Sequence, residues 1–326
     1  MSKQYKIAVD VMGSDKGPEM MIRGVKLALD ANPCLSVCLF GDEEIIRREI
    51  LANGCPADRV EVVGTTQVIT NYDSPATALF EKTDSSLVRA LTETGKRDDI
   101  IGIINAGSTG ALIAGSMRFL STPDRVRPAL AAVLPASTGS FTCLVDTGAT
   151  IDCGASTLVH FAHLGTAFMR DLYKVDSPRV ALLSNGAEPT KGNKVVKEAH
   201  ALLKEDKELN FVGNVEGTNA LSGTCDVLVC DGFAGNQVLK VTEGIATRII
   251  TDIVKYAKKT GKQEFMEVVG YLSATYDLQS LGGGIILGTR KPVIKAHGAA
   301  NERSIANVIE MMLNLVSNKD VFDGKH

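Results

Sequence analysis

The stretch that decides the fold is residues 100–120, IIGIINAGSTGALIAGSMRFL. Its first six residues are mostly β-branched and apolar, as in a buried strand, and they end at Asn105. A glycine-rich turn follows, and residues 109–120 have the composition of a helix. A strand, a short turn and a helix in this order are the building unit of a parallel sheet covered by helices.

The same alternation recurs along the chain. Strands are predicted at residues 6–10, 35–40, 100–105, 129–134, 142–146, 180–184 and 227–231. Helices are predicted at residues 19–31, 79–94, 109–120, 156–172, 191–203 and 235–260. Most of the strands end at an acid, an amide or a glycine. Because open α/β sheets bind ligands beyond the carboxyl ends of their strands, these strand ends contain the candidate site residues.

Composition limits the class of protein. The 326 residues are 44% hydrophobic and 22% charged, which is typical of a globular chain. With no Pro-rich linker and no repeat, residues 1–326 are predicted to form a single domain, either one body or one body with two lobes. The 35 Lys and Arg residues against 38 Asp and Glu give a net charge of −3. This balance argues against a nucleic-acid partner.

Cysteine usage and hydropathy indicate a cytoplasmic protein. The seven cysteines are scattered, odd in number and without CxxC spacing, so free thiols are predicted. No HExxH motif or paired Cys/His spacing predicts a bound metal. The N-terminus lacks a signal-peptide core, and no apolar run approaches the roughly 20 residues that span a bilayer.

One segment, residues 260–284, interrupts the alternation. It combines several apolar residues with three consecutive glycines, and two interpretations stay open. It is either an apolar protrusion closed by a flexible loop, or a helix packed on the core or at a dimer contact.

Two strand ends carry acids, amides and glycines. After the first strand come Asp10, Gly13 and Asp15, where glycines allow a close approach of the backbone to a ligand and acids orient donors. The same pattern also makes an ordinary turn and helix cap. After the strand at 100–105 come the residues of a second cluster, Asn105, Gly107, Ser108, Thr109 and Gly110. Amides and hydroxyls at a helix start suit phosphate or another small anion.

Neither cluster specifies a nucleotide. The second one lacks the lysine of a Walker A loop and the spacing of a GxGxxG dinucleotide motif. We therefore predict no cofactor.

A third cluster pairs a strand end at Asp146 with the segment that contains Lys191 and Asn193. A lysine and an amide at the start of a helix could hold an oxyanion. The alternative is an N-cap at Thr190 followed by a solvated lysine.

The fourth cluster is Asp231, Gly232 and Asn236, which we associate with His297 at the end of another apolar strand. His297 is the candidate catalytic histidine. His160 and His163 have the setting of helix-surface or interface residues, and His200 lies in a charged helical segment.

In their order, these clusters resemble the PlsX family of phosphate:acyl-acyl-carrier-protein acyltransferases. The similarity covers nearly the whole chain. Nine segments carry it: IAVDVMGSD (7–15), NAGSTGAL (105–112), RPALAAVLP (127–135), LVDTGATID (144–152), LVHFAHLG (158–165), PRVALLSNGAEPTKGN (178–193), NFVGNVEG (210–217), CDVLVCDGFAGNQVLKVTEG (225–244) and PVIKAHGA (292–299).

The resemblance implies a three-layer αβα architecture with a mostly parallel sheet, similar to isocitrate and isopropylmalate dehydrogenases. It implies transfer of an acyl group from acyl carrier protein to orthophosphate, which yields acyl phosphate for phospholipid synthesis. It also implies a homodimer and peripheral contact with a membrane. The sequence departs from the family at Ser14, Ser108 and Thr150, and it lacks the basic run usual near residues 80–83.

Our hypothesis assigns catalysis to Lys191, His297, Asn236 and Asp231. Residues 105–110 and Lys191 would hold phosphate, while His297 or Asn236 assists at the carbonyl oxygen or the departing sulfur. The acids Asp10, Asp15 and Asp231 would orient these donors. The phosphate- and substrate-binding set is Asp10, Gly13, Asp15, Asn105, Gly107, Ser108, Thr109, Gly110, Asn193 and Gly232.

Three alternatives remain open. The missing basic run favours a relative that uses acyl-coenzyme A or another small thioester. A non-catalytic acyl-binding relative would keep the fold without the reaction. A nicotinamide-dependent dehydrogenase is disfavoured, because no GxGxxG follows the first strand.

Overall fold

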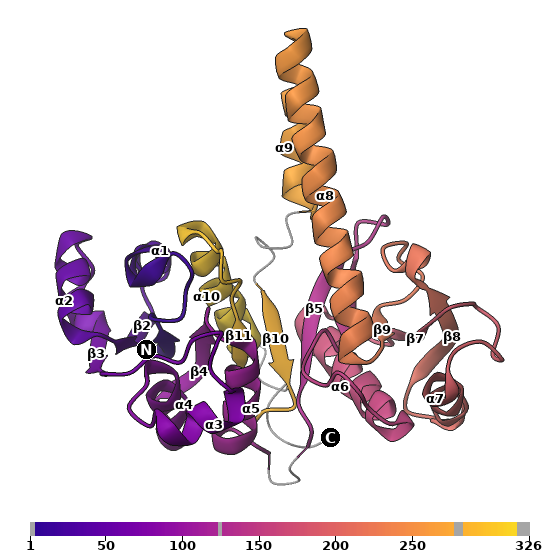
Figure 1. Ribbon diagram of the computed structural model, residues 1–326, viewed down its shortest axis with the longest axis horizontal. Coiled ribbons are helices and arrows are strands. Elements are labelled where there is room, and N and C mark those ends of the chain that lie inside the picture. Colours follow the sequence, from indigo (N-terminus) through magenta and orange to yellow (C-terminus); the bar gives the residue numbers. More distant parts are fainter. Residues whose placement is uncertain (1–3, 123–125, 277–282, 318–326) are drawn as a thin grey trace. The chain divides into compact units, whose positions relative to one another are not determined.

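The chain forms two compact units (Figure 1). The computed structural model describes residues 4–122, 126–276 and 283–317. Unit 1 comprises Met1–Pro128 together with Gly282–His326, and unit 2 comprises Ala129–Leu281. The chain therefore leaves unit 1, builds unit 2 and returns to complete unit 1.

Unit 1 is built on a mostly parallel sheet of order β3-β2-β1-β4-β11-β10, in which β10 and β11 are antiparallel. The strands are β1 (Tyr5–Asp10), β2 (Leu35–Gly41), β3 (Val60–Gly64), β4 (Ile100–Asn105), β10 (Gly284–Leu287) and β11 (Val293–Lys295). β1 lies between β2 and β4, and its register pairs Asp10 with Asn105. The strand order reverses at this point, which is where open α/β sheets bind ligands.

Helices cover both faces of this sheet (Figure 1). One group consists of α1 (Gly17–Ala31), α2 (Glu43–Ala52) and α10 (Glu302–Ser317). The other consists of α3 (Pro75–Glu81), α4 (Ser86–Lys96) and α5 (Thr109–Phe119). Close packing fixes the first group, since a Cβ atom at Gly24 would lie 2.5 Å from Ile305. Unit 1 thus has the three αβα layers that were predicted.

Unit 2 has its own sheet of order β5-β6-β9-β7-β8, parallel except for the hairpin of β5 and β6. Its strands are β5 (Ala129–Pro135), β6 (Phe141–Val145), β7 (Arg179–Ser184), β8 (Asn210–Glu216) and β9 (Val227–Val229). Its helices are α6 (Ala155–Tyr173), α7 (Lys194–Glu205), α8 (Gly232–Thr260) and α9 (Phe265–Tyr276). Short 3-10 turns lie at Gly217–Asn219 in this unit and at Ala57–Arg59 in unit 1.

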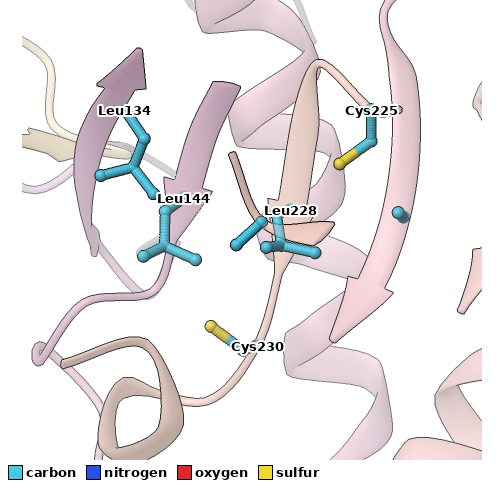
Figure 2. Packing of buried hydrophobic residues seen from close by; sticks show 7 residues of the cluster. Leu134, Leu144, Cys225, Leu228 and Cys230 are labelled. Carbon is cyan, nitrogen blue, oxygen red and sulfur yellow. The ribbon is translucent and has the colours of Figure 1, made fainter. Parts of the chain in front are cut away.

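The sheet of unit 2 buries an apolar core, shown in Figure 2. Leu144 and Leu228 lie side by side on the paired strands β6 and β9, with Leu134 beside them. The start of α8 packs on this cluster through Ala234 and Val238. Removal of each such leucine from water contributes roughly 1.5–3 kcal/mol, and the contacts of Ala234 and Val238 hold the start of α8 against this core.

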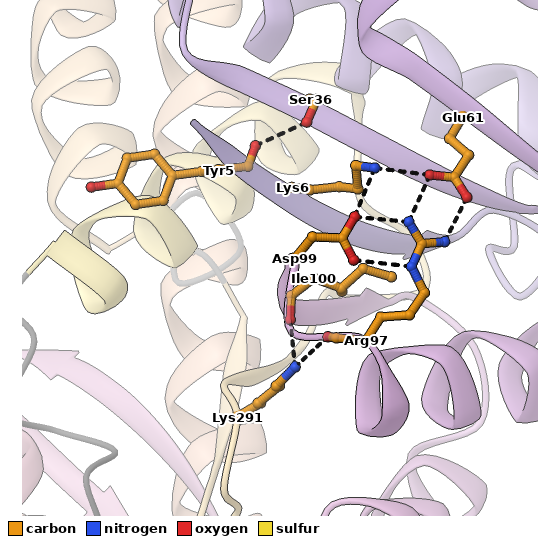
Figure 3. A network of polar contacts seen from close by, with 8 residues as sticks. All are labelled: Tyr5, Lys6, Ser36, Glu61, Arg97, Asp99, Ile100 and Lys291. Carbon is orange, nitrogen blue, oxygen red and sulfur yellow. Dashed lines mark hydrogen bonds and ion pairs between the residues drawn. The ribbon is translucent and has the colours of Figure 1, made fainter. Parts of the chain in front are cut away.

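A network of ion pairs ties together the amino ends of the unit 1 strands (Figure 3). The Arg97 guanidinium binds Asp99, at 2.8 Å, and Glu61, and Lys6 lies 2.9 Å from both carboxylates. The Lys291 ammonium donates to the carbonyl oxygens of Arg97 and Ile100 at 2.7 and 2.8 Å. Ion pairs therefore connect the strands at this end of the sheet. It is the end opposite to the strand ends that carry the candidate site.

All seven predicted strands are present, but three predicted helices differ. The helix predicted at 235–260 begins three residues earlier, at Gly232, because the Asp231 side chain caps it. The predicted helix 79–94 is wrong as one element, because it is divided into α3 and α4. Ser85 caps α4 by accepting the Val88 amide, so the chain cannot continue a helix through it. The predicted helix 191–203 begins only at Lys194, because the Asn193 side chain caps it.

The segment 260–284, which interrupts the predicted alternation of strands and helices, contains α9. This helix packs along α8 in unit 2. Gly261 ends α8 in the left-handed conformation, with φ of 69°, and the rings of Tyr256 and Phe265 meet edge to face at 5.1 Å. Residues 277–282 lie outside the described part of the chain. An exposed apolar row, Val241, Ile245 and Ile249, runs along α8 at a spacing of four residues.

Candidate functional site

A buried carboxylate organises the carboxyl end of the unit 1 sheet. Asp10, only 2% exposed, accepts the Asn105 side-chain amide at 2.7 Å and the Met12 backbone amide at 3.1 Å. Burial raises the pKa of Asp10, and hydrogen bonds from Ser86, Met12 and Asn105 oppose that rise. The Asp10 carboxyl group therefore holds the Asn105 side chain in place.

Asn105 transmits this contact to the glycine-rich turn. Its Nδ2 donates to Asp10, so its Oδ1 faces the other way and accepts the Gly107 amide at 2.9 Å. Both ends of the amide are thus used, and its orientation is fixed. The first turn residue is held by a side chain that is itself held by a buried acid.

Two loops touch backbone to backbone at this point. A Cβ atom at Gly13 would lie 2.5 Å from the Cα of Gly107, and one at Gly107 would lie 2.9 Å from the Cα of Gly13. The loops of the first and second predicted clusters are therefore in direct contact. Gly110 is equally restricted, because its Cβ would lie 2.8 Å from Pro75.

The turn leads directly into α5. Ser108 caps this helix by accepting the Ala111 amide at 3.4 Å, which leaves its hydroxyl hydrogen available to a ligand. The amides of Thr109 and Gly110 belong to the first turn, where a helix offers them no internal acceptor. Backbone N–H groups and the positive end of the helix dipole suit an anion.

The third loop of unit 1 carries His297. The Asp15 amide donates to the Gly298 carbonyl at 3.1 Å, so the loops after β1 and β11 are joined. His297 Nδ1 accepts the Ala299 amide at 3.2 Å. In the neutral ring the hydrogen must then be on Nε2, which makes His297 a donor through that atom.

Lys295 was not among the predicted site residues, although it lies at the same edge. It pairs with Asn105 in the sheet, and its ammonium donates to the carbonyl oxygens of Ala106 and Ala296 at 3.2 and 2.5 Å. These carbonyls precede Gly107 and His297. The signal was a lysine at the end of an apolar strand, two residues before the histidine.

In unit 2 a second buried carboxylate has a similar task. Asp146 is fully buried and accepts four backbone amides, from Leu130, Gly148, Ala149 and Thr150, at 2.6–3.2 Å. Burial raises its pKa, and these hydrogen bonds oppose the rise. Asp146 therefore shapes the loop after β6.

The start of α8 packs against that loop. A Cβ atom at Gly232 would lie 2.7 Å from the Asp146 carboxylate, so this glycine serves close packing. Asn236 donates its amide to the Thr147 carbonyl at 3.2 Å. Asp231 caps α8 by accepting the Ala234 amide at 2.7 Å, which is the ordinary task of an aspartate at this position.

Lys191 lies on the exposed loop between β7 and α7. Asn185 accepts the Gly192 amide at 2.8 Å, and Gly192 takes a φ of 99° that suits glycine. Asn193, not Thr190, caps α7 by accepting the Val196 amide at 2.9 Å. The Asn193 amide nitrogen is therefore left to donate elsewhere.

The chain is similar to known proteins over nearly its whole length. A family model described as fatty acid synthesis protein matches residues 5–321. A phosphate acyltransferase of Halothermothrix orenii is 39% identical over 324 residues, which cover 97% of this chain and 96% of that protein. The chain belongs to the phosphate acyltransferase family. The predicted family and the predicted enzyme class, an acyltransferase of fatty acid and phospholipid synthesis, are confirmed.

Solved structures confirm the fold of this acyltransferase. A phosphotransacetylase from Streptococcus pyogenes superposes with a TM-score of 0.63 at 17% identity, over 98% of this chain and 95% of that chain. A 4-hydroxythreonine-4-phosphate dehydrogenase from Klebsiella pneumoniae gives 0.54 at 15% identity, over 96% and 99%. The predicted dehydrogenase-like αβα architecture is therefore confirmed.

The predicted site residues of the acyltransferase fall into two sets. In unit 1 the structure brings together the loops of Asp10, Gly13, Asp15, Asn105, Gly107 and His297, with Ser108, Thr109 and Gly110 continuing into α5. In unit 2, Asn236 and Gly232 meet the Asp146 loop, whereas Lys191 and Asn193 belong to the loop before α7.

No helix within residues 4–122, 126–276 and 283–317 is long and apolar enough to cross a membrane. Across the same residues, no group of three or more His, Cys, Asp or Glu side chains is placed to hold a metal ion.

Proposed function

We propose that the enzyme transfers a fatty acyl group from the thioester of acyl carrier protein to orthophosphate. A phosphate oxygen attacks the thioester carbonyl carbon, a C–O bond forms, the C–S bond breaks, and the thiol of the carrier leaves. Phosphate is already anionic near neutral pH, and a thiol leaving group has a pKa of roughly 8.5. The main task of the protein is therefore positioning.

The observation that carries this proposal is the hydrogen-bonded series Asp10, Asn105 and Gly107 in a member of this family. It fixes the amides at the start of α5 before a ligand arrives. Preorganised donors cost no rearrangement at the moment of reaction, and the loss of one oxyanion donor typically lowers the rate about 100- to 1000-fold. We assign phosphate binding to residues 105–110, in which the Ser108 hydroxyl and the Thr109 and Gly110 amides donate to phosphate. Asn105 and Gly107 position this turn.

The remaining roles follow from hydrogen-bonding capacity. Lys191 supplies a positive charge for phosphate, and the Asn193 and Asn236 amides are further donors. His297 donates through Nε2 to the carbonyl oxygen or to the departing sulfur. Asp10 orients Asn105, and Asp15 joins the first loop to the His297 loop.

A surface on unit 1 supports the carrier protein as donor. Phe80 is 61% exposed, and the Arg118 guanidinium lies 4.0 Å from the centre of its ring. An apolar ring with an adjacent cation suits an acidic partner. We expect Arg118→Glu to raise the KM for acyl carrier protein several-fold and to leave the KM for acyl-coenzyme A unchanged.

One observation favours acyl-coenzyme A as an alternative donor. The family's basic run is absent near residues 80–83, and the lysine that is present, Lys82, is paired with Asp73 at 2.8 Å. If acyl-coenzyme A supports a higher kcat/KM than the carrier thioester does, the alternative is correct.

Trapping the product with hydroxylamine tests the reaction itself. Acyl phosphate gives a hydroxamate, so we expect rapid hydroxamate formation with acyl carrier protein and phosphate, and only the slow background without phosphate. Binding of the acyl donor with no phosphate-dependent hydroxamate would show a non-catalytic acyl-binding protein instead.

The proposal includes a cytoplasmic homodimer with peripheral membrane contact. The exposed row Val241, Ile245 and Ile249 supports an association surface on α8, since apolar patches of this kind mark interfaces. We expect Ile245→Glu to shift the sedimentation of the protein towards the monomer. Co-sedimentation with anionic vesicles, with and without the substitution, tests the membrane contact separately.

A further inference from the structure

Asn214 and His200 form a buried polar pair in unit 2. Asn214 lies on β8 and is 7% exposed, and His200 lies on α7 and is 8% exposed. The sequence placed His200 in a charged helical segment, yet its ring packs edge to face on Phe211 at 5.1 Å. Buried polar groups need partners, and the partners of this pair lead to the Lys191 loop.

The polarity of the pair is determined by its contacts. The Glu188 carbonyl oxygen can only accept, so the Asn214 amide nitrogen faces it, at 2.9 Å. Asn214 Oδ1 therefore faces His200 Nδ1, also at 2.9 Å, and this nitrogen must carry a hydrogen. His200 thereby fixes the rotation of the Asn214 amide.

The carbonyl that Asn214 holds also sets the direction of Lys191. The Lys191 amide donates to the same Glu188 oxygen at 3.0 Å, which closes the turn. The Lys191 stem lies against Gly186, where a Cβ atom would come within 2.6 Å of its Cγ. The bond between Asn185 and Gly192 is internal to the loop, whereas the Asn214 bond joins the loop to β8.

We propose that Asn214 and His200 are positioning residues for Lys191. They hold the Glu188 peptide against β8, so that the ammonium group is presented to phosphate without a search over loop conformations. This inference rests on the proposed function, in which Lys191 binds phosphate. A shift of about 1 Å can cost about 100-fold, and the internal Asn185 bond limits the shift, so we expect an effect of about 10-fold.

Four variants test the pair by their KM for phosphate. Asn214→Leu removes both bonds, and Asn214→Asp keeps the acceptor for His200 while it loses the donor to Glu188. Both should raise the KM for phosphate about 10-fold, with the KM for the acyl donor changed less than about 2-fold. His200→Leu should have the same effect, and His200→Asn should restore the donor and the low KM. If Asn214→Leu does not fold, Asn214→Asp and the two His200 variants carry the same test.

A double-mutant cycle with Lys191→Ala separates this inference from the proposed function. If the pair acts through Lys191, Asn214→Leu has no further effect on the KM for phosphate in the Lys191→Ala background. Additive effects would overturn the inference. The inference would also be overturned if Lys191→Ala raised the KM for phosphate while Asn214→Leu kept the wild-type value. In that case the role of Lys191 in phosphate binding would stand. A wild-type Lys191→Ala enzyme would overturn both.

His163→Leu is the matched control. His163 contacts Asp206 at 2.8 Å, just beyond the opposite end of α7, roughly 18 Å along the helix from the Lys191 loop. The His163→Leu substitution removes a histidine hydrogen bond in the same unit, and it should leave the KM for phosphate unchanged. A KM that rises as much in this control as in Asn214→Leu would show general destabilisation and overturn the positioning role.

Discussion

Gly13→Ala should lower kcat/KM for phosphate about 100-fold. The new methyl group would lie 2.5 Å from the Cα and 2.8 Å from the amide nitrogen of Gly107, and ordinary contact begins at 3.4 Å. Relief of this clash needs a displacement of about 1 Å between the two loops, which is enough for a loss of that size. The φ of Gly13 is not positive, so backbone strain does not contribute. The substitution should lower the free energy of unfolding by roughly 1–3 kcal/mol, as overpacking of a site typically does.

The assay is initial-rate hydroxamate formation over a range of phosphate concentrations, with unfolding in urea followed in parallel. Gly217→Ala is the control, because nothing lies within 4 Å of a Cβ atom at Gly217. It should be close to wild type in both measurements. A folded Gly13→Ala enzyme with kcat/KM within about 3-fold of wild type would show that contact between the two loops does not position the phosphate.

Three other predictions concern single groups. Asp146→Ala leaves four backbone amides, two buried and two part-buried, without their acceptor and should lower the free energy of unfolding in urea by about 4 kcal/mol; a loss below about 1 kcal/mol would contradict its role as the loop's organiser. The hydrogen bond from Arg97 lowers the pKa of Glu61 to about 2 from its ordinary 4.5, so this ion pair stabilises the fold above pH 4.5 and the contribution is lost as the pH falls towards 2. In acid titrations of stability, Arg97→Ala should therefore lose less over that interval than wild type, and parallel curves would disprove the coupling. His297→Ala should lower kcat at least about 100-fold with an unchanged unfolding midpoint, and retention of wild-type kcat would make the residue part of the scaffold.

The sequence predicted those features that depend on local pattern. Strand positions followed from short β-branched runs, and Asn105 followed from an amide placed directly after one of them. The contact between the loops of Gly13 and Gly107 could be expected from parallel strands ending at the same edge. The family's architecture came from nine ordered segments and agrees with the solved structures.

Features that depend on tertiary packing were not predictable in this way. His200 lies among charged neighbours in the sequence, and its burial arises only when α7 meets Phe211 on β8. β8 itself was missed because this edge strand is partly exposed and not continuously apolar. The break between α3 and α4 depends on one cap at Ser85, which is weak beside the surrounding helical pattern. Cap geometry decides such boundaries within a few residues.

The thiols offer a practical consequence. The reactive form of cysteine is the thiolate, and burial raises the pKa of Cys38, Cys143 and Cys225 to about 12. The two partly exposed cysteines, Cys34 and Cys153, fall one in each unit. A maleimide dye added at neutral pH should therefore label one cysteine in each unit. Energy transfer between a donor dye and an acceptor dye at these two positions would report the distance between the units in solution, and no cysteine would have to be introduced.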